Sequence, residues 1–273
     1  MTDVADVHGA RIPLLGLGTW ELRGRSCARL VEQAIRFGYR HIDTAQMYGN
    51  EAEVGEGVRN SGKRHEVLVV TKLQPTNLLP REVDHSAKES LAKLRLDAID
   101  LLLIHWPNPR VPVSETLGAM ARLRELGVVR HIGVSNFTTK LLDDAVKAAP
   151  APIVCDQFEM HPYLDQSKLV AACKLRGLLP VAYSPIARGH AKGDEVLSRI
   201  GKAHGKTAAQ VSLRYLVQQG VAVIPRTSKV ERLEENAAIF DFMLSADEMK
   251  AIAGLARGDG RIVDWSWSPD WDK

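Results

Sequence analysis

The chain has only three cysteines among its 273 residues, and no two of them form a Cys-x-x-Cys pair. This scarcity argues against a disulfide framework and a thiolate metal site, and it suits a reducing compartment. The chain also lacks an apolar run near the ~18 residues needed to span a bilayer, and its first residues carry acids where a secretory signal carries bases. We therefore expect a cytoplasmic protein without a membrane partner.

A strong net charge is missing as well. Lysine and arginine number 36 against 33 aspartates and glutamates, which leaves a formal charge of +3 at pH 7. Such a small excess does not give a surface that attracts nucleic-acid phosphates, so nucleic acid is not an expected partner. Hydrophobic residues at 45% and charged residues at 25% are ordinary for a folded protein, which excludes the disordered and fibrous classes.

What the sequence does contain is an alternation of short apolar runs with amphipathic stretches, which is typical of parallel βαβ units. Eight runs predict strands: Leu14–Gly18, Arg40–Asp43, Val67–Lys72, Ile99–His105, Ile132–Ser135, Ile153–Phe158, Leu179–Tyr183 and Val221–Pro225. Segments with helical spacing lie between and after them: Cys27–Phe37, Glu51–Val58, Arg81–Leu94, Ser114–Leu126, Lys140–Ala148, Ser167–Leu175, Thr207–Gln218 and Arg232–Ile239.

Eight strands with intervening helices favour a (β/α)8 TIM barrel of ~250 residues over a doubly wound α/β sheet. The alternative, a six-stranded nucleotide-binding sheet followed by a second domain, needs a linker or a composition shift, and the sequence contains neither. We therefore expect residues 1–273 to form a single domain. Val4–Arg11 is predicted to be an N-terminal hairpin cap, Ser245–Leu255 an additional C-terminal helix, and Gly258–Lys273 an irregular tail.

Four polar residues lie at or just after the ends of three neighbouring predicted strands, namely Asp43, Tyr48, Lys72 and His105. Active sites of such barrels form at the carboxyl ends of the strands, so these side chains can meet. The Lys72 ammonium could lower the pKa of Tyr48, Asp43 could balance Lys72, and His105 could donate to a substrate oxygen. Taken singly, Asp43 could be a turn cap, Lys72 a rim residue and His105 a core histidine. Their combination favours a proton-transfer site.

From about Ile12 to Phe242, the chain resembles the aldo-keto reductases. The motifs that carry the resemblance are Gly16-Leu-Gly-Thr-Trp20, Asp43-Thr-Ala-Gln-Met-Tyr48, Val70-Thr-Lys72, Ile104-His105-Trp106-Pro107, Gly133-Val-Ser135-Asn136-Phe137, Gln157 with His161-Pro162, Ala182-Tyr183-Ser184-Pro185 and Ile224-Pro225-Arg226-Thr227-Ser228. So many motifs in one order make the resemblance specific. It is strongest to the compact bacterial members that reduce 2,5-diketo-D-gluconate or methylglyoxal.

The resemblance implies a monomeric, NADPH-dependent barrel that reduces small aldehydes and ketones to alcohols. Catalytic roles are implied for Asp43, Tyr48, Lys72 and His105, with Tyr48 giving the proton while the nicotinamide gives the hydride. Substrate contacts are implied for Trp20, Tyr48, His105 and Trp106. The expected substrates are dicarbonyls such as methylglyoxal, aromatic aldehydes and keto-sugar acids.

The resemblance also implies a cofactor site drawn from many strand ends. Its residues are Thr19, Trp20, Asp43, Ser135, Asn136, Gln157, Tyr183, Ser184, Pro185, Ile186, Ile224, Pro225, Arg226, Thr227, Ser228, Arg232, Glu235 and Asn236. The carboxamide is expected at Ser135, Asn136 and Gln157. The nicotinamide ring is expected against Tyr183, and the 2′-phosphate at Arg226 and Arg232.

Other function classes fit the sequence less well than carbonyl reduction. Gly16-Leu-Gly18 is not a dinucleotide fingerprint, because Glu21 stands where the third glycine is required. A metal-dependent barrel hydrolase would take His105, His161 and Asp156 as ligands, but no predicted strand carries the paired histidines of such sites, so no metal is expected. A regulatory barrel that binds NADPH with little turnover is the alternative, and the complete catalytic set argues against it.

Three features depart from the usual family pattern or remain without a role. Asp156 replaces the asparagine that usually precedes the glutamine, which could place an acid near the nicotinamide. The loop Ser184–Gly193 is short, so it predicts a small lid over the cofactor. Three of the five tryptophans, Trp265, Trp267 and Trp271, fall at the C-terminus, where we expect a tail that packs over the pocket or merely anchors the chain end.

Overall fold

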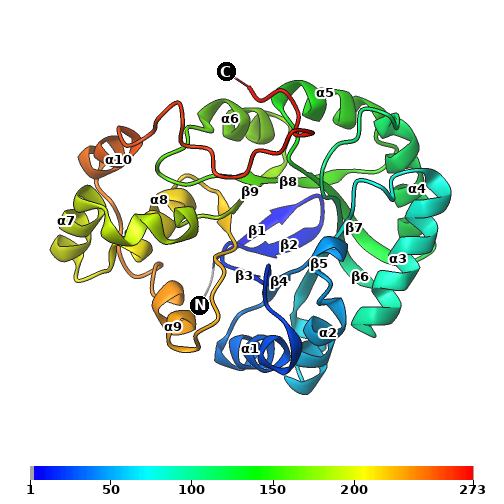
Figure 1. The fold of residues 1–273 in the computed structure, drawn as a ribbon, viewed down its shortest axis with the longest axis horizontal. Coiled ribbons are helices and arrows are strands. Elements are labelled where there is room, and N and C mark those ends of the chain that lie inside the picture. Colours follow the sequence, from blue (N-terminus) through cyan, green and yellow to red (C-terminus); the bar gives the residue numbers. More distant parts are fainter. Residues whose placement is uncertain (1–2, 273) are drawn as a thin grey trace.

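Eight parallel strands form one curled sheet with helices on its outside (Figure 1). The structure is a computed structural model that describes residues 3–272, so residues 1, 2 and 273 of the predicted domain lie outside it. Neighbouring strands run in the order β3 to β10. Their bounds are β3 (Leu17–Gly18), β4 (His41–Asp43), β5 (Leu68–Leu73), β6 (Ile99–Ile104), β7 (Val129–Ser135), β8 (Ile153–Glu159), β9 (Leu179–Tyr183) and β10 (Ala222–Val223). The predicted (β/α)8 architecture is confirmed.

Helices cover the outer face of the sheet. They are α1 (Gly24–Phe37), α2 (Glu51–Asn60), α3 (Pro80–Leu94), α4 (Val113–Glu125), α5 (Thr139–Ala148), α6 (Ser167–Leu175), α7 (Glu195–His204), α8 (Ala208–Gln218), α9 (Glu231–Ala237) and α10 (Ala246–Ala253). Helix α7 has no predicted counterpart, and it begins at an Asp194 side chain that accepts from the Leu197 N–H. Within residues 3–272, no helix is long and apolar enough to cross a membrane.

The apolar core has a part inside the barrel and a part beneath the helices. The predicted hairpin, β1 (Val4–Val7) with β2 (Ala10–Pro13), is present, and its Ala10 and Ile12 pack against interior strand residues such as Leu101. The helices bury the other face of each strand, which is why the strands read as continuous apolar runs. The hairpin thus fills one end of the barrel, and the strand C-termini surround the other.

The barrel closes between its first and last strands through few backbone contacts. The Gly16 N–H donates to the Val223 carbonyl at 2.9 Å, and parallel bridges join Leu15 to Val223 and Gly18 to Arg226. A Cβ on Gly18 would lie 2.8 Å from the Ile224 carbonyl oxygen, so this approach requires glycine. The glycines at Gly16 and Gly18 therefore serve barrel closure, and β3 and β10 are shorter than the predicted runs.

Candidate active site

A continuous polar network joins residues of three strands at the open end of the barrel. The Asp43 carboxylate, at the end of β4, accepts from Lys72 Nζ at 2.5 Å through Oδ1 and from Gln157 Nε2 at 2.7 Å through Oδ2. Lys72 Nζ also donates to the Thr44 carbonyl at 2.9 Å and to the Tyr48 hydroxyl at 3.4 Å. Asp43 and Lys72 are buried. The structure thus brings together the predicted acid, lysine and tyrosine in one chain of hydrogen bonds.

Tyr48 stands on a short 3-10 turn, Gln46–Tyr48, that follows β4. The turn ends at Gly49 in the left-handed conformation (φ 63°), and Gln46 Nε2 fixes it by donating to the Ser86 carbonyl. The Tyr48 ring meets the His105 ring edge to face, with centroids 5.6 Å apart. This places a hydroxyl and an imidazole side by side, where both could contact one substrate oxygen.

The protonation states of this cluster follow mainly from burial. Burial raises the pKa of Tyr48 well above its ordinary value, and the Asp43 charge adds to the shift. Burial therefore outweighs the lowering of the Tyr48 pKa that we expect from the Lys72 ammonium. A raised pKa keeps Tyr48 protonated at neutral pH, as a proton donor must be. Lys72 can still stabilise the phenolate once the proton has left.

His105 is neutral for the same reason. Burial lowers the pKa of His105 well below its ordinary value, and the Lys72 charge adds to the shift. Its Nδ1 is buried and has no hydrogen-bond partner in the structure. A neutral imidazole retains one N–H, so His105 can donate a hydrogen bond to a carbonyl without giving up a proton.

The residues predicted to hold the carboxamide lie next to this cluster. Asn136 Nδ2 donates to the His105 carbonyl at 2.9 Å, and its Oδ1 accepts from the Tyr183 hydroxyl at 2.8 Å. Ser135 Oγ accepts from the same amide at 3.1 Å, and Gln157 donates to Asp43. Amide, hydroxyl and aromatic groups at adjacent strand ends suit a nicotinamide, which needs donors, acceptors and a flat apolar face.

The predicted phosphate site lies at the barrel seam. Arg226 Nε donates to the Trp20 carbonyl at 3.2 Å, and no carboxylate among residues 3–272 forms an ion pair with it. Arg232 is paired with Glu235 on α9, and Glu235 also accepts from Thr207. A guanidinium without an acidic partner is suited to bind a phosphate, so Arg226 fits the role that the sequence gives it.

Aromatic residues border the substrate side of the site. Trp106 is buried, and Trp267 and Trp271 of the C-terminal tail pack on it with centroids 5.1 and 6.0 Å away. Beside them lies a cavity of about 470 Å³, lined by the loop after β6, the start of α5 and residues 267–270 of the tail. Trp20 is 38% exposed, and the Arg188 guanidinium lies 4.6 Å above its ring. The tail therefore packs on Trp106, and Arg188 is a neighbour of Trp20 that the sequence did not indicate.

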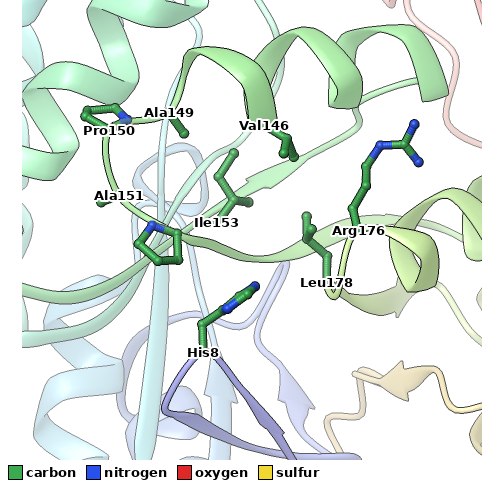
Figure 2. Close-up of a pocket in the computed structure, with 9 residues that line it drawn as sticks. His8, Val146, Ala149, Pro150, Ala151, Ile153, Arg176 and Leu178 are labelled. Carbon is green, nitrogen blue, oxygen red and sulfur yellow. The ribbon is translucent and has the colours of Figure 1, made fainter.

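A second cavity, of about 370 Å³, lies by the hairpin (Figure 2). Figure 2 shows His8 pointing into it from the β1–β2 turn, with Ile153 and Leu178 across from it. The other polar side chain, Arg176, is already bound to Asp143. This cavity lies beside the hairpin and not at the carboxyl ends of the strands, and none of the predicted site residues lines it.

Asp156 lies outside the barrel and away from Gln157. Successive strand residues face opposite sides, and Gln157 points inward to Asp43. Phe158, two residues further on and therefore on the same face as Asp156, packs in the core beneath the helices, so Asp156 faces the helix layer. Asp156 is completely buried, and the Phe137 backbone is the polar group beside its carboxyl. It therefore does not place an acid at the nicotinamide pocket.

Replacing Asp156 by asparagine should stabilise the protein at alkaline pH. Burial raises the pKa of Asp156 well above its ordinary value, so its contribution to stability is complete below the unfolded-state pKa of ~3.9 and is lost as pH rises towards the folded-state value. The melting temperature of Asp156→Asn should exceed the parent's at pH 8 by about 2–4 °C, corresponding to roughly 1 kcal/mol. The difference should shrink towards pH 4. Melting curves of both proteins would contradict this if the difference were independent of pH, and the exposed Asp97→Asn serves as the control.

The three ligands of the hydrolase alternative do not converge. His161 Nε2 pairs with Glu159 at 2.9 Å, Asp156 faces the helix layer, and His105 stands beside Tyr48. In the described part of the chain, no three histidine, cysteine or acidic side chains are grouped as metal ligands would be. The geometry gives the hydrolase alternative no support.

Comparison with known proteins supplies a family. Residues 14–257 match the model of the Aldo/keto reductase family. The methylglyoxal reductase DkgB of Escherichia coli O157:H7 is 42% identical over 265 residues, covering 96% of this chain and 99% of the relative. Aldo-keto reductase family 1 member A1 of Rattus norvegicus is 36% identical, covering 93% and 89%. A crystal structure assigned as a 2,5-diketo-D-gluconic acid reductase B is 46% identical with a TM-score of 0.97, covering 100% and 98%.

Proposed function

The chain belongs to the aldo/keto reductase family, and from this premise we propose how its own residues carry out carbonyl reduction. It is an oxidoreductase of aldehydes and ketones that uses a nicotinamide cofactor. The proposed cofactor is NADPH, and the proposed substrates are small dicarbonyls such as methylglyoxal, aromatic aldehydes and keto-sugar acids. The observation that carries the proposal is the hydrogen-bonded chain from Asp43 through Lys72 to Tyr48, with His105 against the tyrosine ring.

In the proposed mechanism, a bound nicotinamide cofactor would supply the hydride needed to reduce the carbonyl carbon. His105, neutral and buried, donates a hydrogen bond that orients and polarises the carbonyl oxygen. Tyr48 gives its hydroxyl proton to the alkoxide that develops there. Lys72, held by Asp43, stabilises the phenolate that remains. The tail and Trp106 exclude water from one side of the site.

The cofactor would be held along the rim of the barrel. Ser135, Asn136 and Gln157 offer the polar groups for a carboxamide, and Tyr183 offers a ring for stacking. Arg226 and Arg232 would hold the 2′-phosphate. The other proposed contacts come from Thr19, Trp20, Asp43, Ser184, Pro185, Ile186, Ile224, Pro225, Thr227, Ser228, Glu235 and Asn236.

Removing both arginines should abolish the preference for NADPH over NADH. The two cofactors differ only at the 2′-phosphate, so contacts from Arg226 and Arg232 are made to NADPH alone. A charge-assisted hydrogen bond contributes roughly 1.5–3 kcal/mol, so each arginine should account for about ten- to a hundred-fold in NADPH affinity. Fluorescence titration of Arg226→Ala/Arg232→Ala should therefore give nearly equal dissociation constants for the two cofactors. Raising the salt concentration should also reduce the parent's preference for NADPH over NADH, because salt screens the attraction between the arginines and the phosphate.

The control for this titration is Arg81→Ala, which changes an exposed arginine of α3. It should leave both dissociation constants unchanged. An NADPH preference that survives the double change would place the phosphate site elsewhere.

The function itself is tested by one assay of NADPH oxidation with methylglyoxal, a nitrobenzaldehyde and a keto-sugar acid. Reduction of at least one carbonyl supports the proposed function. Tight NADPH binding without turnover of any of them would favour the regulatory barrel instead.

We further propose that the barrel, hairpin and tail act as one domain and as a monomer in the cytoplasm. Three free and buried cysteines support a reducing compartment. The catalytic network comes entirely from one chain, so a partner subunit is not needed to complete it. Sedimentation at micromolar concentration tests the oligomeric state.

A further inference from the structure

Strand β8 carries a second inward-facing polar residue beyond Gln157. Side chains two apart on a strand share a face, so Gln157 and Glu159 point to the same side, with Glu159 nearer the open end. Gln157 contacts Asp43 of the proposed catalytic network. Glu159 is completely buried, and the proposed mechanism gives it no task.

The Glu159 carboxylate binds the start of the C-terminal tail. Its Oε1 accepts from the Ile262 N–H at 2.7 Å, and its Oε2 accepts from the Val263 N–H at 2.7 Å. His161 Nε2 lies 2.9 Å from Oε1, and Gln166 Nε2 donates to the Glu159 carbonyl at 2.8 Å. A buried carboxylate thus satisfies two consecutive peptide groups of a segment that has no regular secondary structure.

The far end of the tail is fixed by a separate contact. Asp272 accepts from the Thr139 N–H at 2.8 Å and from the Thr139 hydroxyl at 2.7 Å at the start of α5. Figure 1 shows the tail crossing the end of the barrel between these two attachments. The described tail is therefore held by Glu159 on the barrel side and by Asp272 on the helix side.

The tryptophans of the tail lie between these two anchors. Trp267 packs on Trp106 at 5.1 Å and stacks with Trp265 at 6.3 Å, with ring planes only 6° apart. Trp265 and Trp267 are 53% and 45% exposed, so two large flat rings face solvent beside the pocket. Exposed aromatic faces at a cavity can stack on an aromatic or sugar-like ligand. Their position depends on where the tail begins.

We propose that Glu159 is a positioning residue for substrate selectivity. By fixing the N–H groups of Ile262 and Val263, it sets the path of the tail and holds Trp265 and Trp267 beside Trp106. The proposal rests on the proposed function, in which Trp106 lines the substrate pocket. Bulky aromatic carbonyls should depend on this arrangement, whereas the much smaller methylglyoxal should not.

The test is the isosteric change Glu159→Gln, which leaves one acceptor oxygen and turns an amide group towards one tail N–H. We expect KM for a nitrobenzaldehyde to rise by about tenfold or more, the effect of one lost charge-assisted hydrogen bond. The kcat for that substrate and the KM for methylglyoxal should change by less than about threefold. Trypsin should release residues 262–273 by cutting after Arg261 faster than in the parent, as followed by mass spectrometry.

A second variant removes the same contact from the tail side. Val263→Pro deletes one of the two N–H groups that donate to Glu159 and leaves every barrel residue unchanged. It therefore tests the role of this contact even if Glu159→Gln folds poorly. It should reproduce the rise in the KM ratio, which is KM for the nitrobenzaldehyde divided by KM for methylglyoxal. It should also reproduce the faster trypsin cleavage after Arg261. The exposed Glu115→Gln on α4 is the matched control.

The outcomes separate this proposal from the proposed function. A parent enzyme that reduces no carbonyl overturns the function. A parent that is active, with variants whose KM ratio and tail cleavage match its own, overturns the role of Glu159. Faster cleavage without a change in KM ratio shows that Glu159 only anchors the tail, and it also overturns the selectivity role.

Discussion

With Tyr48 replaced by phenylalanine, we expect kcat for every carbonyl substrate to fall by ~10²–10⁴, the usual scale of general acid catalysis. The phenylalanine keeps the ring and its edge-to-face contact with His105, so only the hydroxyl is lost. His105 is a poor substitute for the acid, because burial lowers its pKa well below the ordinary value. The affinity for NADPH, measured by fluorescence titration, should hardly change.

The matched control is Tyr39→Phe. Tyr39 is also buried and also donates its hydroxyl hydrogen bond, but to the Leu233 carbonyl on the outer side of the barrel. The kcat of Tyr39→Phe should stay close to that of the parent even if the melting temperature of the variant falls. More than half of the parent rate in Tyr48→Phe would mean that Tyr48 is not the acid.

Lys72→Met should have the second largest effect. The ammonium lies 3.4 Å from the Tyr48 oxygen and is the group that can stabilise the phenolate, so its loss should lower kcat by about 10²-fold or more. Without Lys72 the pKa of Tyr48 rises further. The pH at which alcohol oxidation reaches half its maximal rate should therefore move upwards, because the phenolate acts as the base in that direction.

The lysine change leaves Asp43 buried without its cation, which by itself costs stability. The double variant Lys72→Met/Asp43→Asn removes that unpaired charge and should recover the melting temperature but not the turnover. Lys206→Met, which breaks an ion pair with Asp241 away from the site, is the control. If the pH profile of alcohol oxidation were the same with and without Lys72, the two residues would not be coupled.

The sequence predicted the fold well because strands buried on both faces read as continuous apolar runs. The predicted bounds were less accurate for strands whose ends are not set by an apolar run. Strands β3 and β10 keep only two residues each, because they close the barrel through isolated bridges. Helix α7 was missed although Val196, Leu197 and Ile200 have helical spacing behind the Asp194 cap, so the sequence alone could have predicted it.

At the site, strand order located the residues, but the sequence could not determine their electrostatics. Asp43, Lys72 and His105 come together because their strands are neighbours. The direction in which the Tyr48 pKa shifts depends on how deeply the hydroxyl is buried, and this burial cannot be read from the sequence. Alternation along β8 could have shown that Asp156 faces away from Gln157. It could also have singled out Glu159, but not the tail N–H groups that this residue binds.

The seam between β3 and β10, which has few backbone contacts, affects how the chain folds during synthesis. The strands that meet there come from opposite ends of the chain, so a nascent chain that has not yet reached Ala222 carries an open sheet with an unpaired edge. Contacts of such high sequence separation carry a large loop-closure cost before they form. Trp20 and Arg226 lie on the two sides of this seam, so the proposed phosphate site is completed only when the barrel closes. The cofactor would then act on the finished barrel, as a ligand that slows reopening of the seam, and not as a template on which the chain folds.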